Sequence, residues 1–251
     1  MVVLLSCTLG AVVGLGGGII IRPVLDALGH HDVLNIAFLS STAIVTMAIV
    51  STYKKVKDGT KITVKIAAMI SFGAVVGGMF GNLILEYLLT VFASEYTVRL
   101  IQTGLTVFFV ITAIYFTNSK LQYRIKNEIS YPFIGIILGT MAVFLGIGGG
   151  PINVPLFCIL FGLSVKEATA YSIVVIFFSH TVRIITMGFT VGLLNFDVQY
   201  LLFILPAAII GGFIGSMISK KLSENAVKRA FLATMWGLIL FNIYNAVTFV
   251  I

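Results

Sequence analysis

Charged side chains are scarce in this sequence, and that scarcity decides the class of protein. Asp, Glu, Lys and Arg make up 10% of the 251 residues, hydrophobic residues make up 59%, and the mean hydropathy is +1.11. An ordinary soluble domain is about 25% charged, so a soluble fold could not cover its surface with so few charges. The composition also excludes disordered, coiled-coil, collagen-like and disulfide-scaffold proteins. The long apolar runs indicate membrane helices and not the short alternating strands of an outer-membrane barrel.

Motifs for chemistry are few as well. The two cysteines, Cys7 and Cys158, have no CxxC partner and no neighbouring histidine, so each is interpreted as a buried thiol and no metal site is expected. The sequence has no GxSxG nucleophile motif, no HExxH motif and no acidic dyad. These absences argue against an enzyme, and no cofactor is expected. No acidic residue lies clearly in the middle of an apolar run, which argues against a cation carrier.

The first residues include Leu4-Leu-Ser-Cys7, which has the form of a lipoprotein cleavage box. Only six residues precede the cysteine and none of them is basic, so we interpret the segment as the start of a membrane helix and not as a signal peptide. No soluble extension is evident at either end of the sequence. We therefore expect the function to lie within the bilayer.

The apolar runs between charged stretches predict the membrane segments. These runs cover residues 2–28, 33–53, 62–85, 98–117, 131–161, 168–187, 198–218 and 230–251. A helix needs about 20 residues to cross the hydrocarbon core, so most runs predict one crossing. The runs 2–28 and 131–161 are too long for one crossing and each contains a glycine cluster, which predicts two helical arms around a break. One long tilted helix at each place is the alternative.

Basic residues gather in three loops, namely 54–61, 118–130 and 219–229. Lys and Arg accumulate on the cytoplasmic side of membrane proteins, so these loops are predicted to be cytoplasmic. The acidic loop 86–95 and the loop 188–197, which lacks Lys and Arg, are predicted to face outward. The net charge of +7 is therefore attributed to the basic residues of the cytoplasmic loops, and nucleic acid is not expected as a partner. This alternation requires the run 131–161 to enter and leave the membrane on the cytoplasmic side. It requires the run 2–28 to enter and leave on the outer side. The C-terminus is then expected to lie outside.

The two halves of the sequence match each other. Gly14–Pro23 and Gly146–Pro155 both read GxGGGxxxxP. Two further matches follow in the same order, Ala37–Ser41 with Ala168–Ser172 and Ala74–Gly81 with Ala208–Gly215. Residues 1–117 and 131–251 are therefore predicted to be two transmembrane repeats, joined by the cytoplasmic linker 118–130 within one integrated domain. Equivalent loops are predicted on opposite sides, which makes the repeat inverted, as in many secondary transporters.

These observations predict an all-α polytopic membrane protein. It consists of two inverted-topology repeats of about four to five membrane segments each. A Gly-broken or re-entrant helix pair opens each repeat.

The GxGGGxxxxP motifs supply the parts of an anion site at the interface of the repeats. A helix that begins just after Gly18 or Gly150 directs its free N–H groups and its positive dipole end toward the break. Pro151 suits the first turn of such a helix. The candidate substrate-binding glycines are Gly16, Gly17, Gly18, Gly148, Gly149 and Gly150, and Pro23 and Pro155 are candidate helix breaks. The glycines that follow small-xxx-small patterns are predicted to mediate helix packing instead: Gly73, Gly77, Gly81, Gly211 and Gly215.

Polar residues within the apolar runs are the remaining candidates. Arg183 is a candidate oxyanion ligand, and His180, one turn earlier, is a candidate for proton coupling. The alternatives stay open, since Arg183 could extend to the membrane interface and His180 could be an interhelical hydrogen-bonding residue. An interfacial position is slightly favoured for Arg22. Asn153 lies within the second motif and is a further candidate.

Ser41 and Ser172 occupy matched positions in the two halves, and their hydroxyls, like the amide of Asn153, could donate to an anion. Interhelical hydrogen bonding is the alternative for all three. Ile19 and Ile21 stand where the second motif has Pro151 and Asn153. The second motif is therefore favoured as the ligand site.

With its paired GxGGGxxxxP motifs, its AxxxS segments and its two-half organisation, the sequence resembles the TauE/SafE family. These sulfite-exporter-like membrane transporters are also called the toluene sulfonate uptake permease family. The resemblance covers nearly the whole chain. It implies a multi-pass carrier of the cell inner membrane for small sulfur-containing oxyanions, such as sulfite, organosulfonates or thiosulfate, with proton coupling.

A secondary transporter that works by alternating access is therefore the expected function. An anion channel that uses the same helix N-termini is the alternative. The expected partners are a small anionic substrate and the lipid bilayer, and a homodimer is left open.

Overall fold

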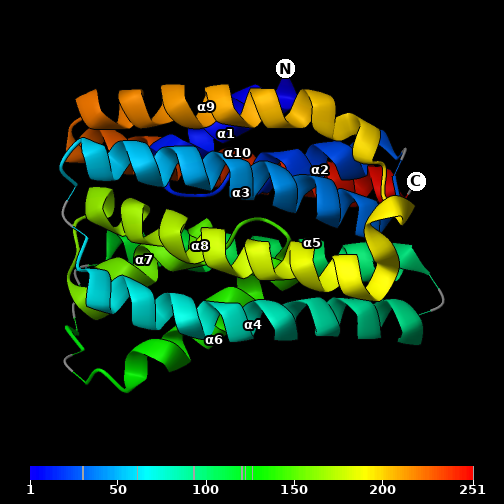
Figure 1. Ribbon diagram of the computed structural model, residues 1–251, viewed down its shortest axis with the longest axis horizontal. Helices are drawn as coiled ribbons and strands as arrows, with labels where there is room; N and C mark the ends of the chain where they lie inside the picture. The colour runs from blue at the N-terminus through cyan, green and yellow to red at the C-terminus, as the bar shows by residue number, and fades with distance from the viewer. Residues whose placement is uncertain are drawn as a thin grey trace.

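Helices that run along the long axis of the molecule make up the computed structural model of the chain (Figure 1). The structure describes residues 1–29, 31–60, 62–92, 94–119, 121, 123–125 and 127–250, with the backbone alone at 194 and 246–250. In chain order the α-helices in these ranges are α1 (Val2–Val13), α2 (Gly18–Leu28), α3 (Val33–Lys57), α4 (Val64–Val91), α5 (Glu95–Asn118), α6 (Ser130–Leu145), α7 (Gly150–Phe161), α8 (Val165–Met187), α9 (Leu201–Lys221) and α10 (Glu224–Val250).

The long helices confirm the prediction of an all-α polytopic membrane protein. In the described ranges six helices are long and apolar enough to cross a membrane: α3, α4, α5, α8 with the π-turn Gly188–Gly192 that follows it, α9 and α10. These six helical segments contain 22 to 28 residues. At a rise of about 1.5 Å per residue, even the shortest exceeds the ~30 Å of the hydrocarbon core.

The two over-long apolar runs are each broken into two helices, and the alternative of one continuous helix is wrong. The first break separates α1 from α2 and the second separates α6 from α7. Gly14 and Gly16 in the first break have φ of 74° and 65°, and Gly146, Gly148 and Gly149 in the second have φ of 65°, 85° and 69°. Side chains rarely adopt this left-handed backbone, so glycine is what permits the breaks.

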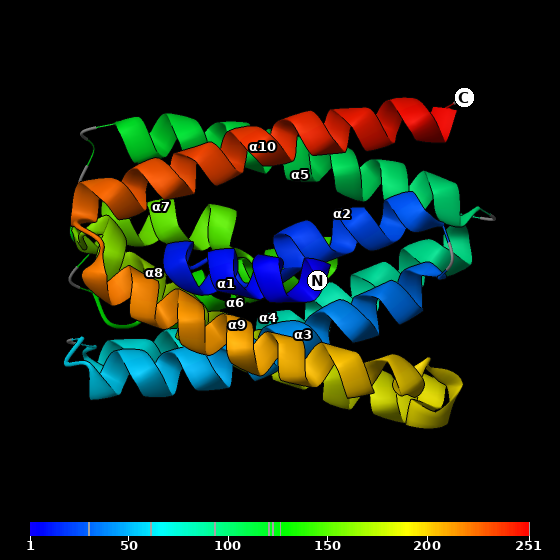
Figure 2. The ribbon, with the colours of Figure 1, turned by 90° about the horizontal axis from the view of Figure 1, so that it is seen from above.

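The chain reverses its direction at the second break. The N–H groups of Tyr123 and Ile125, in the linker before α6, donate to the carbonyls of Ile159 and Leu160 at the end of α7 (2.8 and 2.7 Å). The end of α7 therefore lies beside the linker from which α6 starts. Figure 2 shows α2 and α7 leaving the centre of the molecule in opposite directions.

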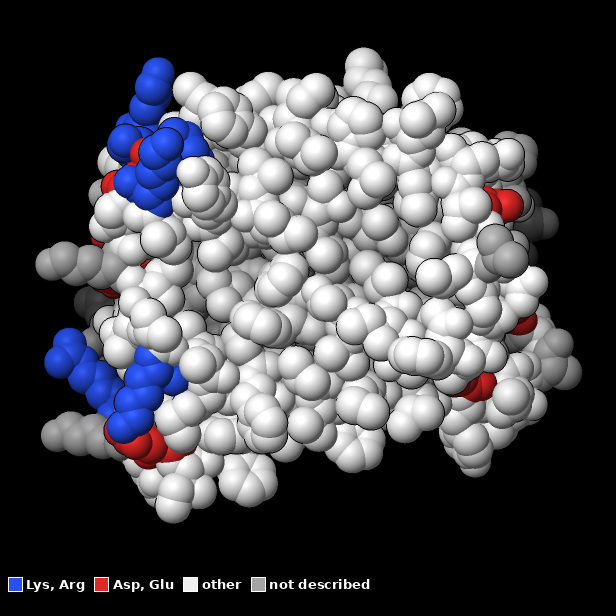
Figure 3. All heavy atoms as spheres, viewed as in Figure 1, with Lys and Arg blue, Asp and Glu red and all other residues white. Residues whose placement is uncertain are grey.

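Contacts between loops define two ends of the bundle. At one end Lys220 binds Asp58 (2.9 Å), which joins the basic loops 219–229 and 54–61, and Lys65 at the start of α4 binds Glu128 of the basic loop 118–130 (2.7 Å). At the other end His31 contacts Asp197 (2.8 Å). We call these the basic end and the acidic end. Figure 3 shows a broad uncharged band between them, and Figure 2 places the C-terminus at the acidic end. Positions 61, 120, 122 and 126 of the basic loops lie outside the described residues.

The small-xxx-small glycines mediate close helix packing, as predicted. A Cβ added to Gly81 of α4 would lie 2.5 Å from the carbonyl oxygen of Thr140 in α6. A Cβ added to Gly211 of α9 would lie 2.7 Å from the carbonyl oxygen of Leu4 in α1. A Cβ added to Gly73, Gly77 or Gly215 would likewise meet a backbone carbonyl oxygen of a neighbouring helix. Each of these contacts joins one half of the sequence to the other.

The prediction that Pro23 and Pro155 break helices is wrong. Pro23 lies inside α2 and Pro155 lies inside α7, and both helices continue to their ends. Each proline lacks the N–H that would bond the fourth preceding carbonyl. Membrane helices tolerate this loss where neighbouring protein covers the freed groups, and Ile19, whose carbonyl Pro23 leaves free, is buried. The glycines, and not the prolines, make the breaks.

Candidate functional site

The two glycine breaks lie against each other in the middle of the fold. A Cβ added to Gly150 would meet Leu15 Cα and would lie 2.6 Å from the carbonyl oxygen of Gly14. A Cβ added to Gly148 would lie 2.7 Å from the carbonyl oxygen of Leu15, and one on Gly18 would lie 3.1 Å from the carbonyl oxygen of Gly146. The glycines therefore serve a second purpose besides helix breaking, because they let two backbones touch.

Each break is followed by the N-terminus of a helix, one residue earlier than predicted. α2 begins at Gly18, with Gly17 as its N-cap, and α7 begins at Gly150, with Gly149 as its N-cap. Pro151 lies in the first turn of α7, as predicted. The first N–H groups of a helix have no partner within the helix, and its positive dipole end favours anions. Since α2 and α7 leave the centre in opposite directions (Figure 2), both of these ends face the middle.

One face of α8 runs along the first break. Ser172 Oγ donates to the carbonyl of Gly14 (2.7 Å), and Ile176 lies 3.3 Å from a Cβ added to Gly16. One turn further, His180 Nδ1 lies 3.1 Å from Ser41 Oγ of α3. Arg183 follows three residues later, and residues three or four apart share a face of a helix. The sequence candidates Ser172, His180 and Arg183 are therefore brought into one row, which starts at the break.

Arg183 is completely buried, so the alternative that it extends to the membrane interface is wrong. None of its three guanidinium nitrogens has a hydrogen-bond partner among the described residues. His180 Nε2 and both polar side-chain atoms of Asn153 are also buried without a partner there. A buried charge without a partner is costly to the fold. These groups are therefore candidates for binding a ligand.

Asn82 of α4 belongs to the same region and was not among the sequence candidates. A Cβ added to Gly78 of α4 would lie 2.7 Å from the carbonyl oxygen of Ser179 in α8. Because α4 and α8 both start at the basic end, Asn82 and Arg183 are level with each other, one turn beyond this contact. Asn82 is fully buried and donates to Glu86 (2.8 Å), while its Oδ1 has no hydrogen-bond partner within the described ranges. Asn82 is an amide among the apolar residues of one predicted membrane run, and this pattern could have indicated it as a candidate.

Arg22 is buried within the protein and does not extend to its surface, which corrects the expectation from the sequence. It is 3% exposed, and its Nη1 donates to the carbonyl of Leu145 (2.7 Å) while its Nη2 donates to Gln102 Oε1. Gln102 in turn donates to the carbonyl of Phe144 (2.6 Å). The last carbonyls of a helix lack partners within it. Arg22 and Gln102 therefore cap the end of α6 that the second break leaves open.

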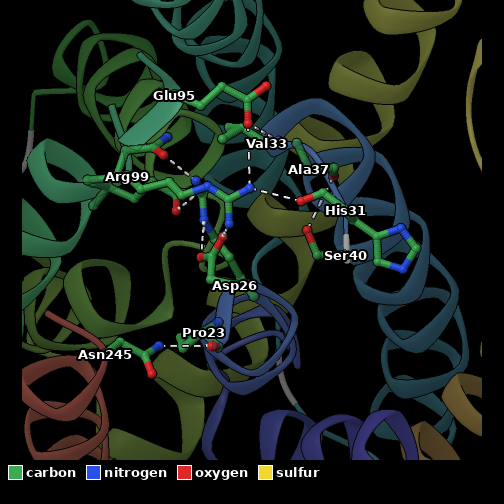
Figure 4. A network of polar contacts seen from close by, with 12 residues as sticks. Pro23, Asp26, His31, Val33, Ala37, Ser40, Glu95, Arg99 and Asn245 are labelled. Atoms are coloured by element: carbon green, nitrogen blue, oxygen red, sulfur yellow. Dashed lines mark hydrogen bonds and ion pairs between the residues drawn. The ribbon is translucent and has the colours of Figure 1, made fainter. Parts of the chain in front are cut away.

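An ionic network closes the acidic end beside this cap (Figure 4). Arg99 of α5 binds Asp26 of α2 (2.9 Å) and the carbonyl of His31 (2.8 Å), and lies 3.5 Å from Glu95. Asp26 also lies 3.6 Å from the Nε of Arg22. The network links the end of α2 to α5 and to the segment before α3.

Replacement of Arg22 by Met is expected to lower the thermal stability of the protein. The change leaves the carbonyl of Leu145 and the Oε1 of Gln102 without a donor, and each unsatisfied buried group costs about 1–3 kcal/mol. Asp26 loses one of its two cationic neighbours and keeps Arg99. Thermal unfolding of the purified protein in detergent measures the effect. Gln102→Leu, which uncaps Phe144, is expected to act in the same direction, and an unchanged melting temperature in both variants would contradict the capping role.

Comparison with known proteins identifies the family. Residues 1–241 match the sequence model of the family described as Sulfite exporter TauE/SafE. The chain belongs to the TauE/SafE family. It is a membrane transporter of that family, which confirms the resemblance drawn from the paired glycine motifs.

Two curated relatives of this TauE/SafE chain carry the name probable membrane transporter protein MamO. The protein from Paramagnetospirillum magneticum is 31% identical over 107 residues, and the one from Magnetospirillum gryphiswaldense is 30% identical over 107 residues. Each match covers 41% of this chain and spans 17% of the length of the relative. No solved structure matches the chain.

Proposed function

We propose that this TauE/SafE transporter moves a small sulfur-containing oxyanion across the cell inner membrane by alternating access, with its two halves acting as inverted repeats. The observation that carries the proposal is the buried, unpartnered guanidinium of Arg183 on the face of α8 that contacts the first glycine break. A guanidinium can bind an oxyanion through two parallel hydrogen bonds. The N-termini of α2 and α7 and the amide of Asn153 would add neutral donors.

The rest of the proposed mechanism follows from the two ends of the bundle. The basic end is the cytoplasmic side by the positive-inside rule. A cavity of about 450 Å³ lies at that end. At the acidic end an ion pair joins Arg99 to Asp26, and His31 contacts Asp197. In the proposed cycle the acidic end opens when these pairs separate and the basic end closes. His180, which lies between Ser41 and Arg183 on the pathway, would carry the coupled proton.

Flux into proteoliposomes that contain the purified protein tests the proposal. Vesicles loaded to give an inward proton gradient are expected to accumulate sulfite, thiosulfate or an organosulfonate above the level of protein-free vesicles, and to lose this accumulation when the gradient is collapsed. Uptake of none of these anions would refute the proposed substrate class. Unitary currents in planar bilayers without dependence on the proton gradient would favour the anion channel instead.

A further inference from the structure

The cavity at the basic end contains a buried lysine that the sequence had placed in a loop. Lys55 belongs to the predicted cytoplasmic loop 54–61, but α3 extends to Lys57 and the side chain of Lys55 is 6% exposed. The cavity lies between the ends of α3 and α9 and the start of α8. Its lining includes Lys55, Lys166, Lys220, Asp58, Ser216 and Ser219.

The ammonium group of Lys55 is bound only by neutral oxygens. Its Nζ lies 3.2 Å from Ser219 Oγ and 3.4 Å from Thr169 Oγ1. Both hydroxyls give their own hydrogens to backbone carbonyls, Thr169 to that of Lys166 (2.7 Å) and Ser219 to that of Val12 (3.3 Å). No ion pair within 4 Å joins Lys55 to a carboxylate among the described residues. An ammonium group has three donors, so one remains for a ligand.

Each carboxylate that lines the cavity has one oxygen bound to a group other than Lys55, and the Oδ2 of Asp58 is buried without a hydrogen-bond partner among the described residues. Asp58 binds Lys220 (2.9 Å) and lies 3.5 Å from Lys54, and the hydrogen bond from Lys220 lowers the pKa of Asp58. Asp58 is therefore ionised at neutral pH and engaged with other lysines. Glu167 and Glu224 accept hydrogen bonds from the backbone N–H groups at the start of α8 (3.0 and 3.3 Å). The charge of Lys55 is thus left for an anion.

The residues around Lys55 also border the first glycine break. A Cβ added to Gly14 would lie 2.6 Å from Thr169 Cα, so Thr169 packs directly on the break. Ser219 reaches the carbonyl of Val12 in the last turn of α1. An anion held by Lys55 would therefore lie between the open cavity and the break.

We propose that the cavity at the basic end is a second anion-binding site, in which Lys55 binds a small oxyanion next to the first glycine break. The inference rests on the proposed function in taking this anion to be the transported one. The ammonium of Lys55 supplies the charge, and Lys166 at the wall adds a second cation. The anion would pass between this site and the row formed by Ser172, His180 and Arg183.

Equilibrium binding of sulfite and sulfate to the purified protein, measured by calorimetry in detergent, tests the site. Lys55→Met and Lys55→Gln are expected to weaken one of the two binding events at least 10-fold, while Lys55→Arg retains most of its affinity. Lys57→Met is the matched control, because Lys57 lies two residues away on the same helix, is exposed and carries the same charge. In an Arg183→Met background, the binding that remains is expected to disappear when Lys55→Met is added.

The outcomes separate this site from the proposed transport. Unchanged affinity in both Lys55→Met and Lys55→Gln, or an equal loss in Lys57→Met, would overturn the Lys55 site even if the wild type transports oxyanions. Binding that depends on Lys55 in a protein that transports no oxyanion would refute the proposed function and support the site. Monodispersity on gel filtration shows that each variant is folded.

Discussion

Met in place of Arg183 is expected to abolish oxyanion transport and, in the absence of substrate, to leave the protein at least as stable as the wild type. The guanidinium is fully buried and has no hydrogen-bond partner in the described part of the chain, so no hydrogen bond there offsets its desolvation cost. Replacement of buried ionic groups by apolar residues of similar volume is often neutral or stabilising by about 1–4 kcal/mol. Loss of transport together with retained or increased stability is typical of a residue kept for binding.

Two measurements check this expectation, namely the melting temperature in detergent and the initial rate of uptake into proteoliposomes. Arg22→Met is the matched control, because Arg22 is the other described arginine with a buried side chain but has partners at Leu145 and Gln102. The two variants should therefore change stability in opposite directions. A melting temperature that falls as far in Arg183→Met as in Arg22→Met, with transport retained, would show that Arg183 has a structural role.

The two arginines also show what can be predicted from the sequence and what cannot. Both lie near the end of an apolar run, and from that position alone neither could be placed. The position of a side chain relative to a membrane interface depends on which helices pack around it. The carbonyl that Arg22 caps belongs to α6, in the other half of the chain, and no local pattern indicates such a contact.

Features that depend on local composition were predicted well. The membrane helices follow from long apolar runs, and both breaks lie at the adjacent glycines. Lys55 shows the limit of this reasoning, because a lysine next to a basic loop was counted as a topology signal and is instead buried in a cavity wall. Pro23 and Pro155 show another limit, since the cost of a proline within a helix depends on what covers the freed carbonyl.

Replacement of Gly150 by Ala is expected to reduce transport by at least 100-fold. Gly150 is the first residue of α7 and does not have a positive φ, so alanine is acceptable to its backbone. The obstacle is the first break, because the new methyl group would meet Leu15 Cα and would lie 2.6 Å from the carbonyl oxygen of Gly14. Backbone atoms cannot yield as flexible side chains do, so the two breaks must separate. Such overpacking costs about 1–3 kcal/mol, which is enough to displace the helix N-termini that would bind the anion.

Gly104→Ala and Gly237→Ala are the matched controls, because a Cβ added at either position meets nothing within 4 Å. Both variants are expected to transport within about twofold of the wild type. Gly149→Ala should fail for a different reason, since Gly149 has φ of 69° and alanine is strained there. Membrane insertion should persist in all four variants, because it depends on the long apolar helices and not on the breaks. Wild-type flux through Gly150→Ala would show that contact between the two breaks is not needed for transport, and would remove the glycine breaks from the proposed site.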